Sequence, residues 1–448
     1  MMTTADTVRA MVERTVFDLC GALLRVCRAR VAAIRAGVAG GEYEAFRRLR
    51  TALSDAIARH RDEEIDEDLR DELVAALSRW KLEEGLRARA LVEAIDEHHG
   101  RAFGLTFRGV ETTLGVGDAV PVARPPWKEI LRDQLGSDPD RLTRRYDATA
   151  HVRLVPDLQG RGLVVDGRID DALATFGRDP CVAGAIPNLA LRDFEWDSYG
   201  DDEDDRRFFA VRPIDGQRQW RRIVALLDLA VRRGVQVLVY PELSFTEALL
   251  ARFAAHVASA AASPPLVVAG SLHVTEASSV RRNRAHIFVR GRELAHHHKL
   301  VPFDLQEGDL TRREDIRGGE TLRMFWCTAP WTVMVLICRD GLDTDIVTAL
   351  EGLQVRMLLA PTLSPKTDTL AAHVERLAVD AQTLSVVANV PAGPRSYLAG
   401  TCLPLIVGLP RSSAPHQARL PDALPDKAFL GVARAGRDAA ITYHPADD

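Results

Sequence analysis

Three chemically capable side chains stand at the ends of three short, largely apolar segments of the chain. They are Glu242, Lys299 and Cys338, and the segments before them span residues 235–241, 293–298 and 331–337. Short runs of β-branched and aliphatic residues predict buried strands. In open α/β sheets, reactive groups gather just beyond the carboxyl ends of strands. We therefore expect a carboxylate, an ammonium group and a thiol at such strand ends.

Together these groups can carry out acyl transfer. A thiol attacks a carbonyl or nitrile carbon as the thiolate, so Cys338 needs a base. Glu242 can serve as that base, because burial raises the pKa of a carboxyl group into the range useful for proton transfer. Lys299 and the backbone N–H of Arg339 can stabilise a tetrahedral oxyanion. The set predicts cleavage of an amide or nitrile through a Cys338 thioester or thioimidate.

The order and the local sequence of the three segments resemble the nitrilase, or carbon–nitrogen hydrolase, superfamily. Its signature is a strand ending in Pro-Glu, a Lys before a short apolar run, and a strand ending in Ile-Cys-x-Asp. The chain has Tyr240-Pro-Glu242, Lys299-Leu-Val-Pro-Phe303 and Leu336-Ile-Cys-Arg-Asp340 in that order. Segments that resemble further strands of the family span residues 267–271, 283–288, 355–361 and 386–389. The resemblance covers about residues 181–448.

The resemblance implies a four-layer α-β-β-α sandwich, usually paired into a homodimer or a larger homo-oligomer. It implies hydrolysis of a nonpeptide C–N bond without a metal or an organic cofactor. It makes Glu242 the general base, Lys299 the cation beside the oxyanion and Cys338 the nucleophile. A second Glu often lies eight residues after the Lys in this family, which makes Glu307 the supporting acid. Carbamoyl-amino-acid hydrolases of the family carry an Arg shortly after the Cys. Gly341-Leu-Asp343 stands there instead, so that substrate class loses support.

The pattern of apolar residues divides the α/β chain into three parts. Residues 1–105 carry three stripes at helical spacing and predict a bundle of amphipathic helices. Residues 106–180 predict a linker or a small mixed α/β segment, with a hairpin formed by residues 151–155 and 162–165. Residues 181–448 predict the hydrolase-like domain.

Composition excludes several classes of protein. The net charge of −5 argues against a general affinity for nucleic acid or membranes. No apolar run approaches the roughly 20 residues that a bilayer-spanning helix needs. Six Cys residues without a C-x-x-C pair suit a reducing compartment. The first residues lack the pattern of a signal peptide. We therefore expect a cytoplasmic protein.

Other interpretations of single residues carry less weight. His296, His297 and His298 suggest a metal site, but alternation on a strand divides them between two faces, so we predict no metal. His373 would have to complete a Cys–His protease site, but it lies in an amphipathic helical pattern. Asp340 can either orient the turn at Cys338 or cap the helix that follows, and we favour the cap. The acidic run over residues 196–205 predicts a solvated loop, with a lid over the active site as the alternative.

These patterns predict a cofactor-free thiol amidohydrolase that acts on a small amide, or less readily on a nitrile. The alternative is a nitrilase-fold binding or regulatory module, or an acyltransferase, whose role is set by the N-terminal domain. The N-terminal helices are then the expected site for a protein partner. No ATP-binding loop of a synthetase is found in the sequence.

Overall fold

The structure is a computed structural model that describes most of the chain. It describes residues 3–11, 14–60, 64–122, 149–177, 179–188, 193–199, 207–260, 262–307, 310–327, 331–364, 367–390, 403–409, 416–417, 428–434 and 441–446. These residues form two compact units. The first comprises residues 1–108 and 112–159, and the second comprises residues 109–111 and 160–448. The junction near residue 111 lies within β1 (Glu111–Leu114).

The first unit is mainly helical. Its described helices are α1 (Thr4–Arg9), α2 (Val16–Ala29), α3 (Val31–Ala39), α4 (Tyr43–Arg59), α5 (Glu67–Arg79), α6 (Glu84–His99) and the 3₁₀ helix η1 (Phe103–Phe107). The predicted helical bundle is confirmed, but only the second stripe is a single helix, α4; the first contains α1, α2 and α3, and the third contains α5 and α6. Capping explains the difference: Thr15 and Asp18 form a capping box that begins α2, and the Glu83 carboxylate caps α6. The unit also contains an antiparallel pair, β2 (Ala119–Pro121) with β3 (Val152–Leu154).

The second unit contains two large sheets. The first has the order β4 (Gly162–Asp166), β14 (Thr321–Trp326), β15 (Thr332–Val335), β16 (Met357–Leu363), β17 (Leu384–Val390), β18 (Leu405–Gly408) and β19 (His416–Gln417), with β1 next to β4. The second has the order β11 (Arg292–His298), β10 (Arg281–Val289), β9 (Leu266–Thr275), β8 (Val237–Val239), β5 (Cys181–Ile186), β20 (Phe429–Arg434) and β21 (Thr442–Pro445). The strands predicted from residue 181 onward are found here.

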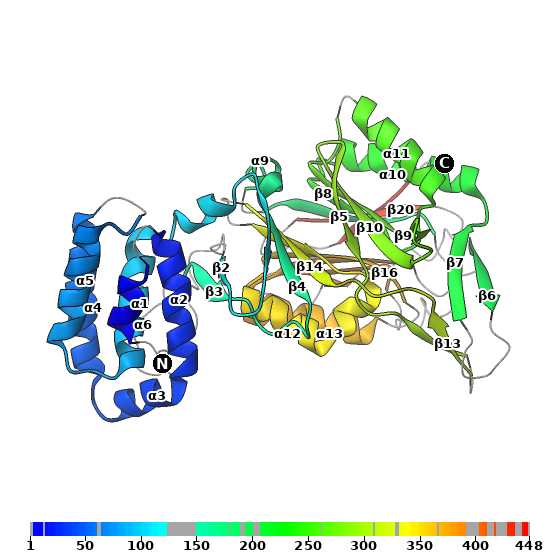
Figure 1. Ribbon diagram of the computed structural model, residues 1–448. Coiled ribbons are helices and arrows are strands. Elements are labelled where there is room, and N and C mark those ends of the chain that lie inside the picture. Colours follow the sequence, from blue (N-terminus) through cyan, green and yellow to red (C-terminus); the bar gives the residue numbers. More distant parts are fainter. Residues whose placement is uncertain are drawn as a thin grey trace. The chain divides into compact units, whose positions relative to one another are not determined.

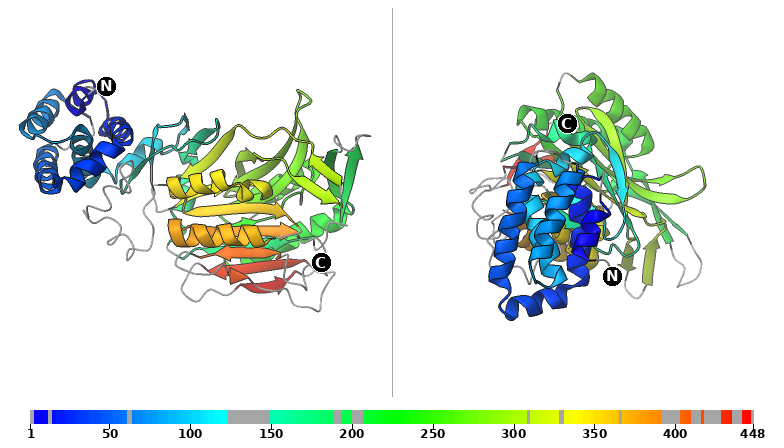
Figure 2. Two further views of the ribbon diagram at one scale, coloured as in Figure 1. Left: turned by 90° about the horizontal axis from the view of Figure 1, so that it is seen from below. Right: turned by 60° about the vertical axis from the view of Figure 1, so that its left-hand side comes forward.

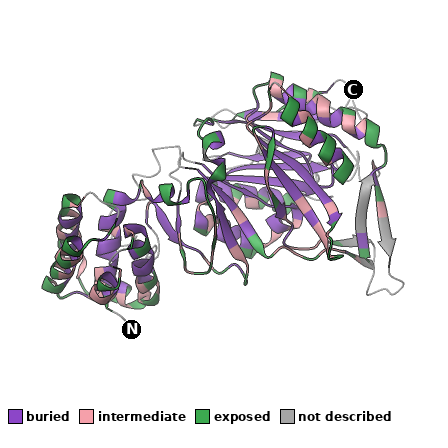
Figure 3. Ribbon diagram, turned by 45° about the horizontal axis from the view of Figure 1, so that its top comes forward, coloured by how far each residue is buried: buried purple, intermediate pink, exposed green. Residues whose placement is uncertain are grey.

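The two large sheets pack face to face between two layers of helices. Strands β16 and β17 of one sheet lie against β8, β9 and β5 of the other. Helices α10 (Gly216–Arg232) and α11 (Glu247–Ser259) cover the second sheet, and α12 (Thr344–Leu353) and α13 (Asp368–Arg376) cover the first (Figure 1 and Figure 2). Burial follows these layers, because the strands between the helices are mostly buried and the outer helix faces are exposed (Figure 3). The predicted α-β-β-α sandwich is confirmed.

The other helices that the structure describes in this unit are short. They are η2 (Gly167–Ile169), α9 (Asp170–Leu173), the 3₁₀ helix η4 (Cys338–Leu342) and the π-helix η5 (Leu377–Ala381). Among the described helices, none combines the length and hydropathy needed to cross a bilayer.

A small sheet extends beside the sandwich. Its order is β12 (Asp304–Glu307), β13 (Leu310–Glu314), β7 (Arg207–Pro213) and β6 (Phe194–Tyr199) (Figure 1). The predicted solvated loop over residues 196–205 is therefore wrong at its start, because residues 196–199 belong to β6 and pair with β7. Residues 200–206 lie outside the described residues, so the alternative of a lid remains a prediction.

The predicted hairpin of residues 151–155 with 162–165 is wrong. Strand β3 pairs with β2, and β4 pairs in parallel with β14. Both β3 and β4 pair with strands other than each other. The turn residues between β3 and β4 do not reveal this pairing. Residues 160–180, predicted to precede the hydrolase-like domain, belong to its compact unit.

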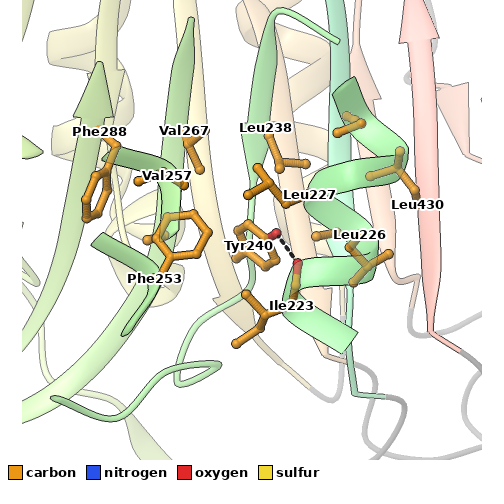
Figure 4. Packing of buried hydrophobic residues seen from close by; sticks show 14 of the residues in the cluster. Ile223, Leu226, Leu227, Leu238, Tyr240, Phe253, Val257, Val267, Phe288 and Leu430 are labelled. Atoms are coloured by element: carbon orange, nitrogen blue, oxygen red, sulfur yellow. Dashed lines mark hydrogen bonds between the residues drawn. The ribbon is translucent and has the colours of Figure 1, made fainter. Parts of the chain in front are cut away.

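Aromatic packing fixes the strand that leads to Glu242. The ring of Tyr240 packs edge-to-face against Phe245 and Phe253, and its hydroxyl donates to the carbonyl of Ile223 on α10 at 2.8 Å (Figure 4). Tyr240 is fully buried. Because Glu242 follows two residues later, the same core that attaches α10 to the sheet also fixes the position of the carboxylate.

Gly270 allows β9 to pass close to the backbone before Glu242. Its φ is 61°, and a Cβ would lie 2.2 Å from the carbonyl oxygen of Pro241. We predict that Gly270→Ala lowers the free energy of unfolding by roughly 2–5 kcal/mol, since it adds a backbone clash to left-handed strain. The exposed Gly234, with φ 67° and no atom near its Cβ position, is the control. Gly234→Ala should cost about 1–2 kcal/mol. Equal losses in urea unfolding would contradict this prediction.

Candidate functional site

The structure brings Glu242, Lys299 and Cys338 together. Lys299 Nζ lies 2.9 Å from Glu242 Oε1, and both side chains are almost completely buried. Glu242 follows β8 and Lys299 follows β11, whereas Cys338 follows β15 of the facing sheet. Both Glu242 and Lys299 act electrostatically on the Cys338 thiol. The predicted strand ends therefore meet between the two sheets.

The backbone of Leu363 connects the base to the nucleophile. Leu363 is the last residue of β16. Its N–H donates to Glu242 Oε2 at 3.0 Å, and its carbonyl lies 3.7 Å from Cys338 Sγ as acceptor of the thiol. One backbone residue of the first sheet thereby orients two side chains from different sheets.

Positive φ angles occur at Cys338 and at the residue that follows Glu242. Cys338 has φ 45°, and Leu243, directly after Glu242, has φ 60°. Residues with a Cβ rarely adopt this conformation, which costs on the order of 1–2 kcal/mol. The sharp turn at Cys338 ends the strand and begins η4, so that the side chain faces the site. Backbone strain of this kind concentrates at functional sites.

Glu314 is a second buried acid beside Lys299, and the sequence analysis did not identify it. It ends β13, and its Oε2 lies 2.7 Å from Lys299 Nζ. Asn283 Nδ2 donates to Oε1 of Glu242 at 2.8 Å and to Oε1 of Glu314 at 2.9 Å. His273 Nε2 lies 2.8 Å from Glu314 Oε1. The five side chains thus form one buried hydrogen-bonded network.

The predicted supporting acid, Glu307, lies at the end of β12, and its side chain is outside the described residues. The hairpin of β12 and β13 returns the chain to the site and places Glu314 next to Lys299. The segment before Glu314, Leu310-Thr-Arg-Arg, has no alternating pattern that would single out this acid. The role of Glu307, which the family spacing from the Lys indicates, remains a prediction.

Asp340 orients the turn at Cys338, which was the disfavoured interpretation. Its Oδ1 accepts from the N–H groups of Leu300 and Val301 at 2.9 Å each, and its Oδ2 accepts from Ile337 N–H at 3.1 Å. Helix α12 is capped by Asp343 instead. Asp340 therefore connects the segment after Lys299 to the turn that carries Cys338.

The three consecutive histidines alternate as predicted. His297 is buried with Nε2 3.7 Å from Asp340 Oδ2, whereas His298 Nε2 accepts from Arg284 at 2.9 Å. Burial, followed by the charge of Arg284, lowers the pKa of His296 to about 4 and that of His298 to about 3. Both rings are therefore neutral near pH 7.

Burial and charge set the proton positions in the site. Burial raises the pKa of Glu242, although Lys299 opposes the shift. Burial, together with the charge of Glu242, raises the pKa of the Cys338 thiol well above its ordinary range. Burial disfavours the charge of Lys299, but Glu242 and Glu314 outweigh it and raise its pKa well above the usual value. The resting thiol is therefore protonated, next to a base able to accept the proton.

The site also offers donors for an oxyanion. Lys299 has three N–H donors, of which two point to Glu242 and Glu314. Its third N–H can bind a substrate oxygen. The N–H of Arg339 lies in the first turn of η4, where a helical N–H has no acceptor within its own helix. The role predicted for Arg339 remains a prediction.

Among the described residues, no group of three or more His, Cys, Asp and Glu side chains is arranged to hold a metal ion. The chemistry available to the described site is that of a thiol, two carboxylates and an ammonium group.

Comparisons with known proteins find similarity only among solved structures. No family model and no curated protein matches the chain. The NitN amidase from Nesterenkonia sp. AN1 is 16% identical, with 60% of this chain and 92% of that chain covered and a TM-score of 0.39. A mutant of the Nesterenkonia AN1 amidase, which is from the nitrilase superfamily, is 15% identical, with 60% and 91% covered and a TM-score of 0.38.

The glutamine-dependent NAD⁺ synthetase from Acinetobacter baumannii is also similar. It is 15% identical, with 60% of this chain and 48% of that chain covered and a TM-score of 0.39. At these levels of identity, the similarities assign no substrate and no residue role to this chain.

The two interpretations of Asp340 predict different losses of unfolding free energy for Asp340→Ala. We predict that Asp340→Ala lowers the free energy of unfolding by roughly 3 kcal/mol or more, because three N–H groups lose a charged acceptor. Asp343→Ala removes a helix cap and should cost about 1 kcal/mol. Urea unfolding of both variants measures the difference. A loss for Asp340→Ala no larger than that for Asp343→Ala would contradict the orienting role.

Proposed function

We propose that the chain is a carbon–nitrogen hydrolase of the nitrilase superfamily that acts as a cofactor-free thiol amidohydrolase. The observation that carries the proposal is the convergence of three groups: Lys299 pairs with Glu242, and the Leu363 backbone contacts both Glu242 and Cys338. A buried base, a protonated thiol and an ammonium group are the groups that amide cleavage through a thioester requires.

In the first half-reaction Cys338 Sγ attacks the carbonyl carbon of the amide, and Glu242 Oε2 accepts the thiol proton. Lys299 Nζ and the N–H of Arg339 stabilise the oxyanion. When the tetrahedral intermediate collapses, the C–N bond breaks and Glu242 transfers its proton to the departing amine. The products of this half-reaction are the free amine and a Cys338 thioester.

In the second half-reaction Glu242 accepts a proton from water as the water oxygen attacks the thioester. The C–S bond then breaks, and the proton returns from Glu242 to the sulfur. The net reaction converts an amide and water into a carboxylic acid and an amine. A nitrile would follow the same path through a thioimidate. Transfer of the acyl group to an acceptor other than water would differ only in the second half-reaction.

The free-energy cost of burying charged groups in the site argues against a binding module as the function. Burying an ionised group costs several kcal/mol unless it is paired and hydrogen-bonded. The site holds two carboxylates and an ammonium group, all nearly inaccessible to solvent. A binding module has no need of this arrangement. A homodimer and a protein partner of the N-terminal helices remain part of the proposal.

Intact-protein mass spectrometry with a panel of small amides and nitriles tests the function. We predict product formation, or an acyl adduct, in the wild type and loss of both by at least about 10³-fold in Cys338→Ala, because the nucleophile is absent. Cys181→Ala is the matched control, since this buried thiol lies on β5. Retention of turnover in Cys338→Ala would refute the mechanism.

The pH dependence follows from the pKa of Glu242. Glu242 must be ionised to accept the thiol proton, and burial raises its pKa above the ordinary value of 4.5. We therefore predict that kcat/KM falls on acidification through a pKa higher than 4.5. On the alkaline side, Lys299 should cause no loss below its ordinary pKa of 10.5, because the two carboxylates raise it. Glu242→Gln should abolish activity at every pH. An acidic limb at or below pH 4.5 would contradict the role of Glu242.

A further inference from the structure

The Glu314 carboxylate is surrounded by hydrogen-bond donors. Its Oε1 lies 2.8 Å from His273 Nε2 and 2.9 Å from Asn283 Nδ2. Its Oε2 lies 2.7 Å from Lys299 Nζ and 2.8 Å from the N–H of Phe303. Asn283, Lys299 and Phe303 contribute N–H donors, so they favour the ionised acid. The remaining neighbour is His273, whose side chain is 1% exposed.

Glu242 has a different set of neighbours. Its Oε1 accepts from Lys299 and Asn283, and its Oε2 accepts from Leu363 N–H. The remaining neighbour of this carboxylate is the Cys338 thiol, whose hydrogen bond also acts on the pKa of Glu242. Of the two buried acids, Glu242 therefore has the oxygen that faces the proton to be transferred.

We propose that His273 is a positioning residue that donates from Nε2 to Glu314, keeps Glu314 ionised, and so makes Glu242 the sole acceptor of the Cys338 proton. The inference rests on the proposed function, and it adds a residue outside the Glu-Lys-Cys set. His273 lies on β9, directly opposite Asn283 on β10, so the two donors to Glu314 Oε1 come from neighbouring strands.

Of the charged groups near His273, Glu314 is the one that contacts the ring. Glu314 faces the ring from β13, and Lys299 and Glu242 lie behind Glu314 and Asn283. Arg281, two residues before Asn283 on β10, pairs with Asp315, which also pairs with Arg207 of β7. The acid in contact with the ring is thus Glu314.

The electrostatics of Glu314 agree with this geometry. Burial favours the protonated acid, but the charge of Lys299 and the hydrogen bond from His273 outweigh it and hold the pKa of Glu314 well below its ordinary range. Glu242 and Glu314 form a coupled pair of carboxylates. Without the His273 donor, this pair binds its first proton at a higher pH. A pair that already holds this proton is a weaker acceptor for the thiol proton, because one of its two negative charges is neutralised.

Alkylation of Cys338 by iodoacetamide tests the proposal without a substrate. The rate constant is measured against pH by peptide mass spectrometry for the wild type, His273→Phe and His273→Gln. A hydrogen bond to a charged group corresponds to a pKa change of about 1–2 units. We expect the acidic limb of His273→Phe to move upward by about this amount. We expect His273→Gln, whose amide N–H can replace Nε2–H, to restore at least half of the shift.

Two results would overturn the role of His273. One is an unchanged acidic limb in His273→Phe, including a rate lowered equally at all pH values, which is what a purely structural role produces. The other is the same shift in His273→Gln as in His273→Phe. Thermal melting of each variant verifies that the protein is folded. Failure of the proposed function gives a separate result, because Cys338 of the wild type would then lack selective, pH-dependent alkylation.

Discussion

The buried ion pairs of Lys299 with Glu242 and Glu314 are the interaction on which the site depends. Three ionised groups lie in a region almost without solvent, and the desolvation penalty of such groups can exceed their mutual attraction. The network offsets this cost only where every oxygen has donors, which Asn283, Phe303 and Leu363 supply. The arrangement contributes little to stability but is useful as a preorganised electrostatic environment.

The two facing sheets make this network possible. One sheet supplies Glu242, Lys299, Asn283 and His273, and the other supplies Cys338 and the backbone of Leu363. The base and the nucleophile meet only when the sheets pack with the register observed. Asp340 reinforces that packing, because it binds the segment after Lys299 to the turn at Cys338. The fold therefore controls the spacing between the cation and the sulfur through backbone hydrogen bonds, which tolerate little displacement.

Local patterns in the sequence predicted the strand ends, whereas the sandwich and the convergence of the three side chains were implied by the resemblance to the nitrilase superfamily. Glu242 and Cys338 each follow a short apolar run, and such runs predict both the strand and its end. Glu314 could not be predicted, since its position depends on how far the hairpin of β12 and β13 returns. The role proposed for His273 was missed, and the orienting role of Asp340 was considered but not favoured, for a similar reason: contacts with residues distant in sequence have no local signature. The predicted hairpin of residues 151–155 and 162–165 was wrong because its strands pair elsewhere.

A double-mutant cycle between Glu242 and Lys299 tests most directly whether the buried ions act as one unit. The quantity measured is the second-order rate constant for alkylation of Cys338 in the wild type, Glu242→Gln, Lys299→Met and the double variant. Groups that act as a unit show strongly non-additive effects. The account predicts that the double variant reacts no more slowly than the slower single variant. A rate loss in the double variant equal to the product of the two single losses would contradict it.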